Sequence, residues 1–299
     1  MNPLEQAITT SQRLRPHTKA QYLRHVRAFV TFAGGDPRSW TGAAVERFRD
    51  AELGRGVSVA FVNTELSAVK KASERWSKLG NGPDFAAAAE LLPVLDAKTR
   101  EALPFDRAQD LVAACEGGSP IDLRDMAIVV FLARTGIRRE GLVGITFEDV
   151  SGTEVVVTLK GGKRHKLVMD AETREVMGAW MRWLKRHGVE TGPVFRGIRS
   201  KVETDGAVGD GLGVTGLHAV IKRRGARAKM PGLHAHILRH SFISWSRALE
   251  IPDWRIALST GHKVLTAPGV PTVPQLGSYT TDPRAHEGAG SWLPPLRRK

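Results

Sequence analysis

Side chains that can act on a phosphodiester gather towards the C-terminal end of the chain. The run HILRH contains His236 and Arg239, the pair GH ends with His262, and Tyr279 lies in the run GSYTTD. A phenol can attack phosphorus, a guanidinium can hold phosphate oxygens, and an imidazole can donate hydrogen bonds or transfer protons. The chain has only two tyrosines, Tyr22 and Tyr279, so the candidates for a tyrosine nucleophile are few. These residue types indicate phosphoryl transfer without a metal.

The charge of the chain predicts a polyanionic partner. Its 299 residues include 44 Lys and Arg against 31 Asp and Glu, which gives a formal net charge of +13 and a pI near 10.3. A positive field of this size attracts nucleic acid or anionic surfaces. A basic ribosome-associated factor would have a similar charge, so only the chemistry of the motifs separates the two classes.

Length and cysteine content predict the organisation and the compartment. Hydrophobic cores tend to split into units of roughly 100 to 200 residues, so we expect two domains. The one cysteine, Cys115, excludes a disulfide within the chain and indicates a reducing, intracellular environment. Residues 1–12 do not resemble a signal peptide, and no apolar run approaches the ~20 residues of a membrane span. We expect a cytoplasmic protein that does not contact membranes, associated with the nucleoid if the organism is prokaryotic.

The first part of the chain predicts a small helical domain. Apolar residues recur at helical spacing over 16–33, and further helices are predicted over 41–52, 57–79 and 84–92. Basic residues on these helices either follow a phosphate backbone or form solvated faces. The candidates for DNA contact here are Arg24, Arg27, Lys70 and Lys71.

The remainder predicts a mixed domain after a proline-flanked linker. Helices are expected over 106–114, 123–135 and 171–187, strands over 154–159 and 165–169, a short strand over 193–196, and a basic helix from about residue 214. The predicted division is a helical N-terminal domain at 1–93, a linker at 94–104, a second domain at 105–283 and a C-terminal tail at 284–299.

Two basic clusters of the second domain are further candidates for phosphate contact. One lies at the tip of the predicted β-hairpin and the other on the helix after residue 214, where positive charge is densest. Their members are Lys163, Arg164, Lys222, Arg223, Arg224 and Arg227.

Taken together, the motifs resemble those of the tyrosine recombinases, the phage integrase family. The hallmarks of that family are a TGLR-type box, a lysine on a β-hairpin, an HxLRH box, a GH or GW pair and a tyrosine. All five occur here in that order, with Arg138 in the run TGIRREGL and Lys160 in the run TLKGGK. The resemblance implies a mainly α fold with a small β-hairpin sheet, in which a helical N-terminal core-binding domain precedes a mixed α+β catalytic domain.

The resemblance also implies a role for each motif residue. Tyr279 would attack the DNA backbone and form a 3′-phosphotyrosyl intermediate with release of a 5′ hydroxyl, while Arg138 and Arg239 hold the transition state. Lys160 would protonate the leaving oxygen, with Lys163 as its nearest competitor. His236 and His262 would donate hydrogen bonds to the phosphate or assist proton transfer. No cofactor or metal is then required.

Three features of the sequence depart from the family or allow another reading. Gly141 stands where the family usually has an acidic residue, and Glu140 precedes it. The interval between His262 and Tyr279 is long and contains three prolines. Zinc is an alternative for His236 and His240, which are spaced i, i+4, although the glutamate of zinc hydrolases is missing between them.

The predicted function is therefore site-specific recombination. We expect an enzyme that cleaves and rejoins double-stranded DNA as a homotetramer on paired sites, with accessory DNA-bending or directionality proteins as possible partners. The alternatives are a type IB topoisomerase-like strand transferase and a catalytically inactive DNA-binding relative. The tail either packs on a neighbouring protomer or is disordered.

Overall fold

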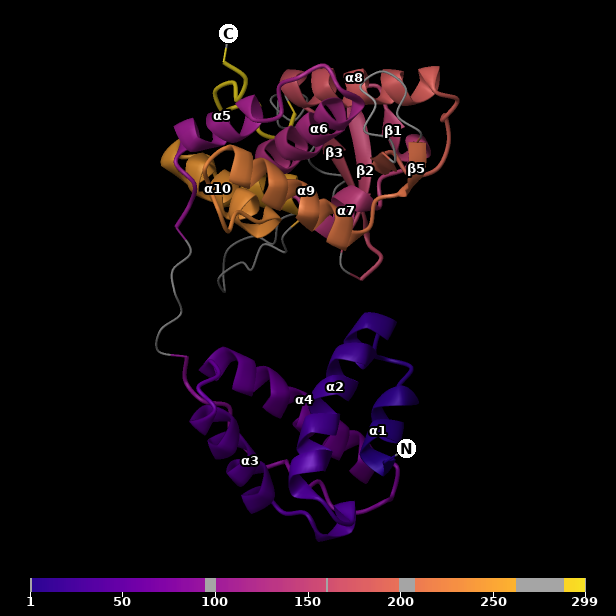
Figure 1. Cartoon of the computed structure of the whole chain (residues 1–299), viewed down its shortest axis with the longest axis vertical. Helices are drawn as coiled ribbons and strands as arrows, with labels where there is room; N and C mark the ends of the chain where they lie inside the picture. The colour runs from indigo at the N-terminus through magenta and orange to yellow at the C-terminus, as the bar shows by residue number, and fades with distance from the viewer. Residues whose placement is uncertain (1, 95–100, 160, 199–207, 262–287, 299) are drawn as a thin grey trace. The chain divides into compact units, whose positions relative to one another are not determined.

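The computed structural model of this chain describes residues 2–94, 101–159, 161–198, 208–261 and 288–298. The chain divides into two compact units, residues 1–98 and 99–299 (Figure 1). Helices dominate both units, and the described strands form two small antiparallel sheets in the second. The predicted fold class is confirmed.

The first unit is a bundle of helices around an aromatic core. Phe29, Phe48 and Trp76 are almost completely buried, and Phe29 meets Phe48 edge to face. The Ser58 side chain accepts a hydrogen bond from the Phe61 amide and so caps the longest helix. The helices are α1 (Pro3–Thr9), α2 (Pro16–Ala33), α3 (Gly42–Gly54) and α4 (Val59–Lys78), with a 3-10 turn at Pro37–Ser39.

The helix predicted over 84–92 is wrong. Residues 85–88 form a turn instead, and Phe85, Ala86 and Ala89 are buried in the core of the unit. The backbone there bonds to side chains of α4: the Ala86 amide donates to Ser73 Oγ, and Lys70 donates to two carbonyls of the turn. Tertiary hydrogen bonds thus replace the helical ones that an alanine-rich sequence favours.

The second unit packs helices around a three-stranded sheet. The strands β1 (Val150–Ser151), β2 (Glu154–Thr158) and β3 (Arg164–Val168) are antiparallel and lie in chain order, and β4 (Arg196–Ile198) pairs with β5 (Val208–Gly211). The helices are α5 (Phe105–Ala113), α6 (Pro120–Thr135), α7 (Arg139–Val143), α8 (Ala171–Arg186), α9 (Val214–Arg227), α10 (Ala235–Ala248) and α11 (Asp253–Thr260).

Helix α6 is the central element of this unit. Ser119 and Asp122 form a capping box at its start, and every residue from Ala127 to Thr135 is buried. A helix that is apolar on most faces must be enclosed by others, and α8, α9 and α10 all pack against it. The helix ends at Gly136, which has a left-handed conformation with φ of 62°.

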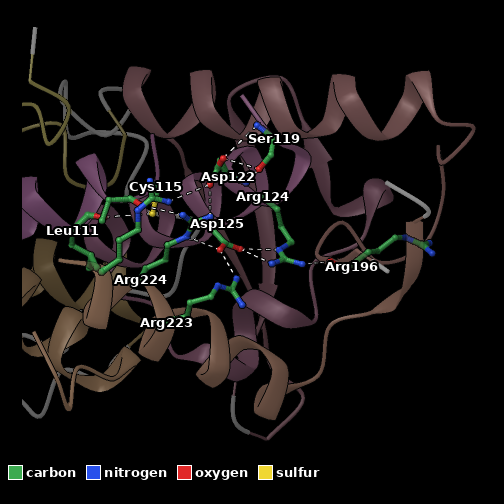
Figure 2. Close-up of polar contacts among 11 residues, drawn as sticks. Leu111, Cys115, Ser119, Asp122, Arg124, Asp125, Arg196, Arg223 and Arg224 are labelled. Carbon is green, nitrogen blue, oxygen red and sulfur yellow. Dashed lines mark hydrogen bonds and ion pairs between the residues drawn. The ribbon is translucent and has the colours of Figure 1, made fainter. Parts of the chain in front are cut away.

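A buried ionic network fixes α9 to α6 (Figure 2). The Asp125 carboxylate is fully buried and accepts hydrogen bonds from three guanidiniums, those of Arg124, Arg223 and Arg224. Arg224 also donates to Asp122 at 2.7 Å and to the Ala114 carbonyl at 2.9 Å. Such charges are tolerated in a core only when all their hydrogen bonds are made, and this network therefore orients α9.

The C-terminal residues 288–298 pack on their own unit. The buried Arg134 of α6 forms an ion pair with Asp170 and donates to main-chain carbonyls of the tail, among them that of Pro294 at 2.6 Å. Glu172 accepts hydrogen bonds from the Leu296 and Arg297 amides. Residues 288–298 therefore lie against α6 and α8 of their own unit, and packing of the tail on a second protomer stays a prediction.

Asp125→Asn tests the ionic network. The neutral amide accepts hydrogen bonds from three guanidiniums poorly and leaves buried positive charge uncompensated, so we expect a loss of about 3 to 5 kcal/mol in the free energy of unfolding. Urea denaturation of the second unit measures it. The matched control is Asp253→Asn, whose exposed ion pair with Arg247 should contribute less than about 1 kcal/mol. Equal losses in the two variants would contradict the role given to Asp125.

Candidate active site

The turn after α6 places the first catalytic candidate. At Gly136 a Cβ atom would lie 2.6 Å from Phe242 Cδ1 and 2.9 Å from Thr260 Cγ2, in addition to the strain of the left-handed backbone. Only glycine fits both restrictions. The chain then turns directly into α7, and Arg138 is the N-cap residue of that helix.

Arg239 is buried where two other helices end. Its Nη1 atom donates to the Gly136 carbonyl at 2.5 Å and to the Thr260 carbonyl at 2.8 Å, at the C-termini of α6 and α11. Helix C-termini carry partial negative charge, which favours a cation there. Burial, and to a lesser extent the charge of Arg138, lower the pKa of Arg239 to about 10. The guanidinium is therefore still protonated at neutral pH.

Both arginines line one cleft of about 440 Å³ together with His236. His236 lies in the first turn of α10, whose amide groups make a helix N-terminus a favourable place for an anion. Two guanidiniums and an imidazole around a cleft of this size suit a phosphate group. The lining residues are Ile137, Arg138, Arg139, Glu140, His218, His234, Ala235, His236 and Arg239.

Three predicted catalytic residues lie outside the described residues: Lys160, His262 and Tyr279. Of the hairpin that was predicted to carry the lysine, the described parts are β2, β3 and the turn residues Gly161 and Gly162, both with positive φ. The structure thus brings together Arg138, His236 and Arg239 of the six predicted catalytic residues, and the assignment of the other three stays a prediction.

His165 connects this hairpin to α11. Its imidazole is buried and its Nε2 atom lies 2.5 Å from the Leu258 carbonyl, two residues before Thr260. Burial lowers the pKa of His165, which favours the neutral ring that donates this hydrogen bond. The sheet is therefore linked to one of the two helices that hold Arg239.

Gly141, which stands where the family usually has an acidic residue, is closely packed. Gly141 is buried in α7, and a Cβ atom there would lie 3.3 Å from Ile137 Cγ1 and 3.5 Å from the Thr158 carbonyl. Glu140 lines the cleft instead and accepts a hydrogen bond from Arg139 at 3.0 Å. Burial opposes its ionisation, but this hydrogen bond and the charges of Arg139 and Arg138 hold the pKa of Glu140 below its usual value. Glu140 therefore adds a negative charge to the lining of the cleft, close to Arg138.

Two histidines of the cleft were not assigned from the sequence. His234 is the N-cap residue of α10, two positions before His236, so its proximity to the HILRH run was a usable signal. His218 reaches the cleft from α9, and nothing in the sequence around it indicates this. Their imidazoles add groups that can donate to an anion.

One DNA-binding candidate of the second unit is wrong. Arg224 is only 3% exposed and its guanidinium is occupied by Asp122, Asp125 and a carbonyl, so it cannot reach DNA. Arg223 also binds Asp125, but its side chain is 52% exposed. The other candidates, Lys163, Arg164, Lys222 and Arg227, are exposed.

The candidates of the first unit differ in what they bind. Arg27 pairs with Glu5, Lys71 pairs with Glu74, and Lys70 donates to carbonyls of the 85–89 segment. Arg24 is exposed on α2, and its Nη2 atom lies 3.4 Å from the ring of the buried His25. Because Arg27 and Lys71 are paired with carboxylates, which compete with a phosphate for them, Arg24 keeps the most capacity to bind one.

The described part of the chain has neither a metal-binding cluster nor a membrane-spanning helix. There, no group of three or more His, Cys, Asp or Glu side chains is placed to hold a metal ion. Burial raises the pKa of the Cys115 thiol to about 12, which leaves it unreactive. Among the same residues no helix combines the length and apolarity that crossing a bilayer requires.

Comparison with known proteins gives a family match and curated relatives. The pattern of the Phage integrase family matches residues 101–266. Tyrosine recombinase XerC of Xanthomonas campestris pv. campestris (strain B100) is 26% identical over 251 residues, which covers 82% of this chain and 74% of the relative. XerC of Pseudomonas putida (strain W619) is 25% identical over 243 residues, covering 79% and 78%.

Solved structures share the fold. A lambda integrase (75-356) dimer bound to a COC' core site superposes with a TM-score of 0.66 at 15% identity, covering 90% of this chain and 97% of that one. The XerH recombinase in a post-cleavage complex with a palindromic difH substrate gives 0.63 at 16% identity, covering 81% and 71%.

Gly136→Ala tests the turn that carries Arg138. The methyl group adds left-handed strain and overlaps Phe242 and Thr260, so we expect a loss of about 2 to 5 kcal/mol in the free energy of unfolding. Gly152→Ala is the control, because Gly152 has a similar φ of 58° but nothing within 4 Å of the added methyl group. Its loss should be roughly 1 to 2 kcal/mol. Denaturant titration that finds the two losses equal would exclude a steric role for Gly136.

The lowered pKa of Arg239 predicts a loss of anion binding in alkali. Affinity for inorganic phosphate should be steady from pH 8 to 9 and fall as the pH rises through about 10, where Arg239 loses its proton. Calorimetric titrations across this range measure the affinity, with circular dichroism at each pH to confirm that the protein is folded. In Arg239→Gln the step near pH 10 should be absent, and a step that persists would belong to another group.

Proposed function

The chain belongs to the phage integrase family, and from this we propose that it is a site-specific recombinase that cleaves and rejoins DNA strands. The observation that carries the proposal is the cleft in which Arg138, Arg239 and His236 converge. The family match and the XerC relatives favour recombination over a type IB topoisomerase-like activity.

The proposed reaction is a transesterification on one phosphodiester. Tyr279 Oη gives up its proton to His236 and forms a bond to phosphorus while the bond from phosphorus to the 5′ oxygen breaks. The 5′ oxygen takes a proton from Lys160. Arg138 and Arg239 neutralise the charge that develops on the non-bridging oxygens, and His236 and His262 donate hydrogen bonds to them. Attack by a 5′ hydroxyl on the phosphotyrosine reverses these steps, so rejoining consumes no nucleotide.

Double-stranded DNA is the proposed substrate and a homotetramer the proposed assembly. Lambda integrase has been solved as a dimer on a core site and as a tetramer on a Holliday junction, both with TM-scores of at least 0.65 to this chain. The exposed basic residues of both units, in particular Arg24 and Arg223, are proposed to contact the DNA backbone. We place this activity in the cytoplasm.

A covalent adduct tests the proposal. Duplexes bound by the protein are first selected from a randomised library, and a nicked version of the selected site then traps the intermediate. We expect a protein–DNA adduct that survives denaturation, is absent in Tyr279→Phe and is unaffected by EDTA, because no metal takes part.

Tyr22→Phe is the matched control, since it removes the other tyrosine of the chain. It should form the adduct at the rate of the unmodified protein. An adduct that persists in Tyr279→Phe, or that is lost in Tyr22→Phe, would show that the nucleophile has been wrongly assigned.

A further inference from the structure

Trp292 of the C-terminal segment contacts two helices at once. Its Nε1 atom donates to Ser246 Oγ of α10 at 2.9 Å, and its ring lies 5.9 Å from that of Phe242 on the same helix. The guanidinium of Arg255, on α11, lies over the indole at 4.9 Å from its centre. Stacking a cation on an indole is favourable, and more so away from water: here Arg255 is buried and Trp292 is half-buried.

The same two helices hold the catalytic guanidinium. Arg239 belongs to α10, and Thr260, which accepts one of its hydrogen bonds, is the last residue of α11. Phe242 packs directly against Gly136, and the Gly136 carbonyl accepts another hydrogen bond from Arg239. Trp292 therefore contacts Phe242, which packs against one of these acceptors, and Arg255, which belongs to the same helix as the other.

The segment also contacts the third helix of this arrangement. Gly290, with φ of 75°, is so close to α6 that a Cβ atom there would lie 2.2 Å from the Arg134 carbonyl. Arg134 in turn donates to the Gly290 carbonyl at 2.8 Å. Arg134 is two residues before Gly136, and residues 290–292 thus contact α6, α10 and α11.

We propose that Trp292 is a positioning residue for Arg239. The Gly136 and Thr260 carbonyls that accept from Arg239 belong to different helices, so a small shift between α6, α10 and α11 breaks one of these hydrogen bonds and turns the guanidinium in the cleft. The indole prevents that shift by packing on Phe242, Ser246 and Arg255 together. The inference rests on the proposed function, because it assumes that Arg239 binds the phosphate.

The test measures the affinity of the full chain for inorganic phosphate. Trp292→Ala should weaken binding roughly 10-fold or more, the effect of disturbing one hydrogen bond to a charged group. Trp292→Phe should restore most of the affinity, because it keeps the ring on Phe242 and Arg255. Trp183→Ala is the control for stability: Trp183 is buried and stacks on Trp180 and His187 of the α8 region, and this variant should bind phosphate normally.

A double-mutant cycle separates positioning from general destabilisation. In Arg239→Lys, which cannot bridge the two carbonyls in the same way, adding Trp292→Ala should cause no further loss of phosphate affinity. Additive losses, or normal binding by Trp292→Ala alone, would overturn the inference and leave the proposed function intact. If Arg138→Ala binds phosphate as well as the unmodified protein does, the cleft is not the anion site, and both proposals are wrong.

Discussion

The second unit of this protein depends on one guanidinium that bonds to two helix ends. Arg239 is buried and donates to the last carbonyls of α6 and α11. Removing a guanidinium from water is costly, and the negative ends of two helices offset that cost only if both remain in place. The relative positions of α6, α10 and α11 therefore determine where the positive charge of Arg239 lies in the cleft.

The arginines of the second unit divide into two kinds. Arg124, Arg134 and Arg224 are buried and bind carboxylates or carbonyls, and so they hold the helices together. Others, such as Arg138 and Arg223, keep part of the guanidinium accessible. The net charge of +13 counts both kinds alike, although the charge of the first kind is compensated within the fold. Arg239 belongs to neither kind, because it is buried and donates to carbonyls but also lines the cleft.

This division marks the limit of what the sequence could predict. The family-like motifs pointed to Arg138, His236 and Arg239, which line one cleft, and helical periodicity predicted both ends of α2. Both signals are local in the chain. The burial of Arg224 depends on Asp125, which is 99 residues away in sequence, and the 84–92 segment depends on side chains of α4. Contacts between residues this far apart in the sequence produce no periodic pattern in it. The position of His218 in the cleft has no such pattern either.

The main-chain contacts of the C-terminal segment 288–298 affect how its sequence can diverge. Arg134 and Glu172 bind main-chain carbonyls and amides of that segment, and such groups are present whatever the side chain. Substitutions at its exposed residues should therefore cost little. The exceptions are Trp292, which packs on α10 and α11, the buried Leu293 and Leu296, and Gly288 and Gly290, whose backbones lie against neighbouring backbone. Insertion or deletion of a single residue would shift every contact out of register. Homologues should thus vary at the exposed positions of this segment while keeping its length.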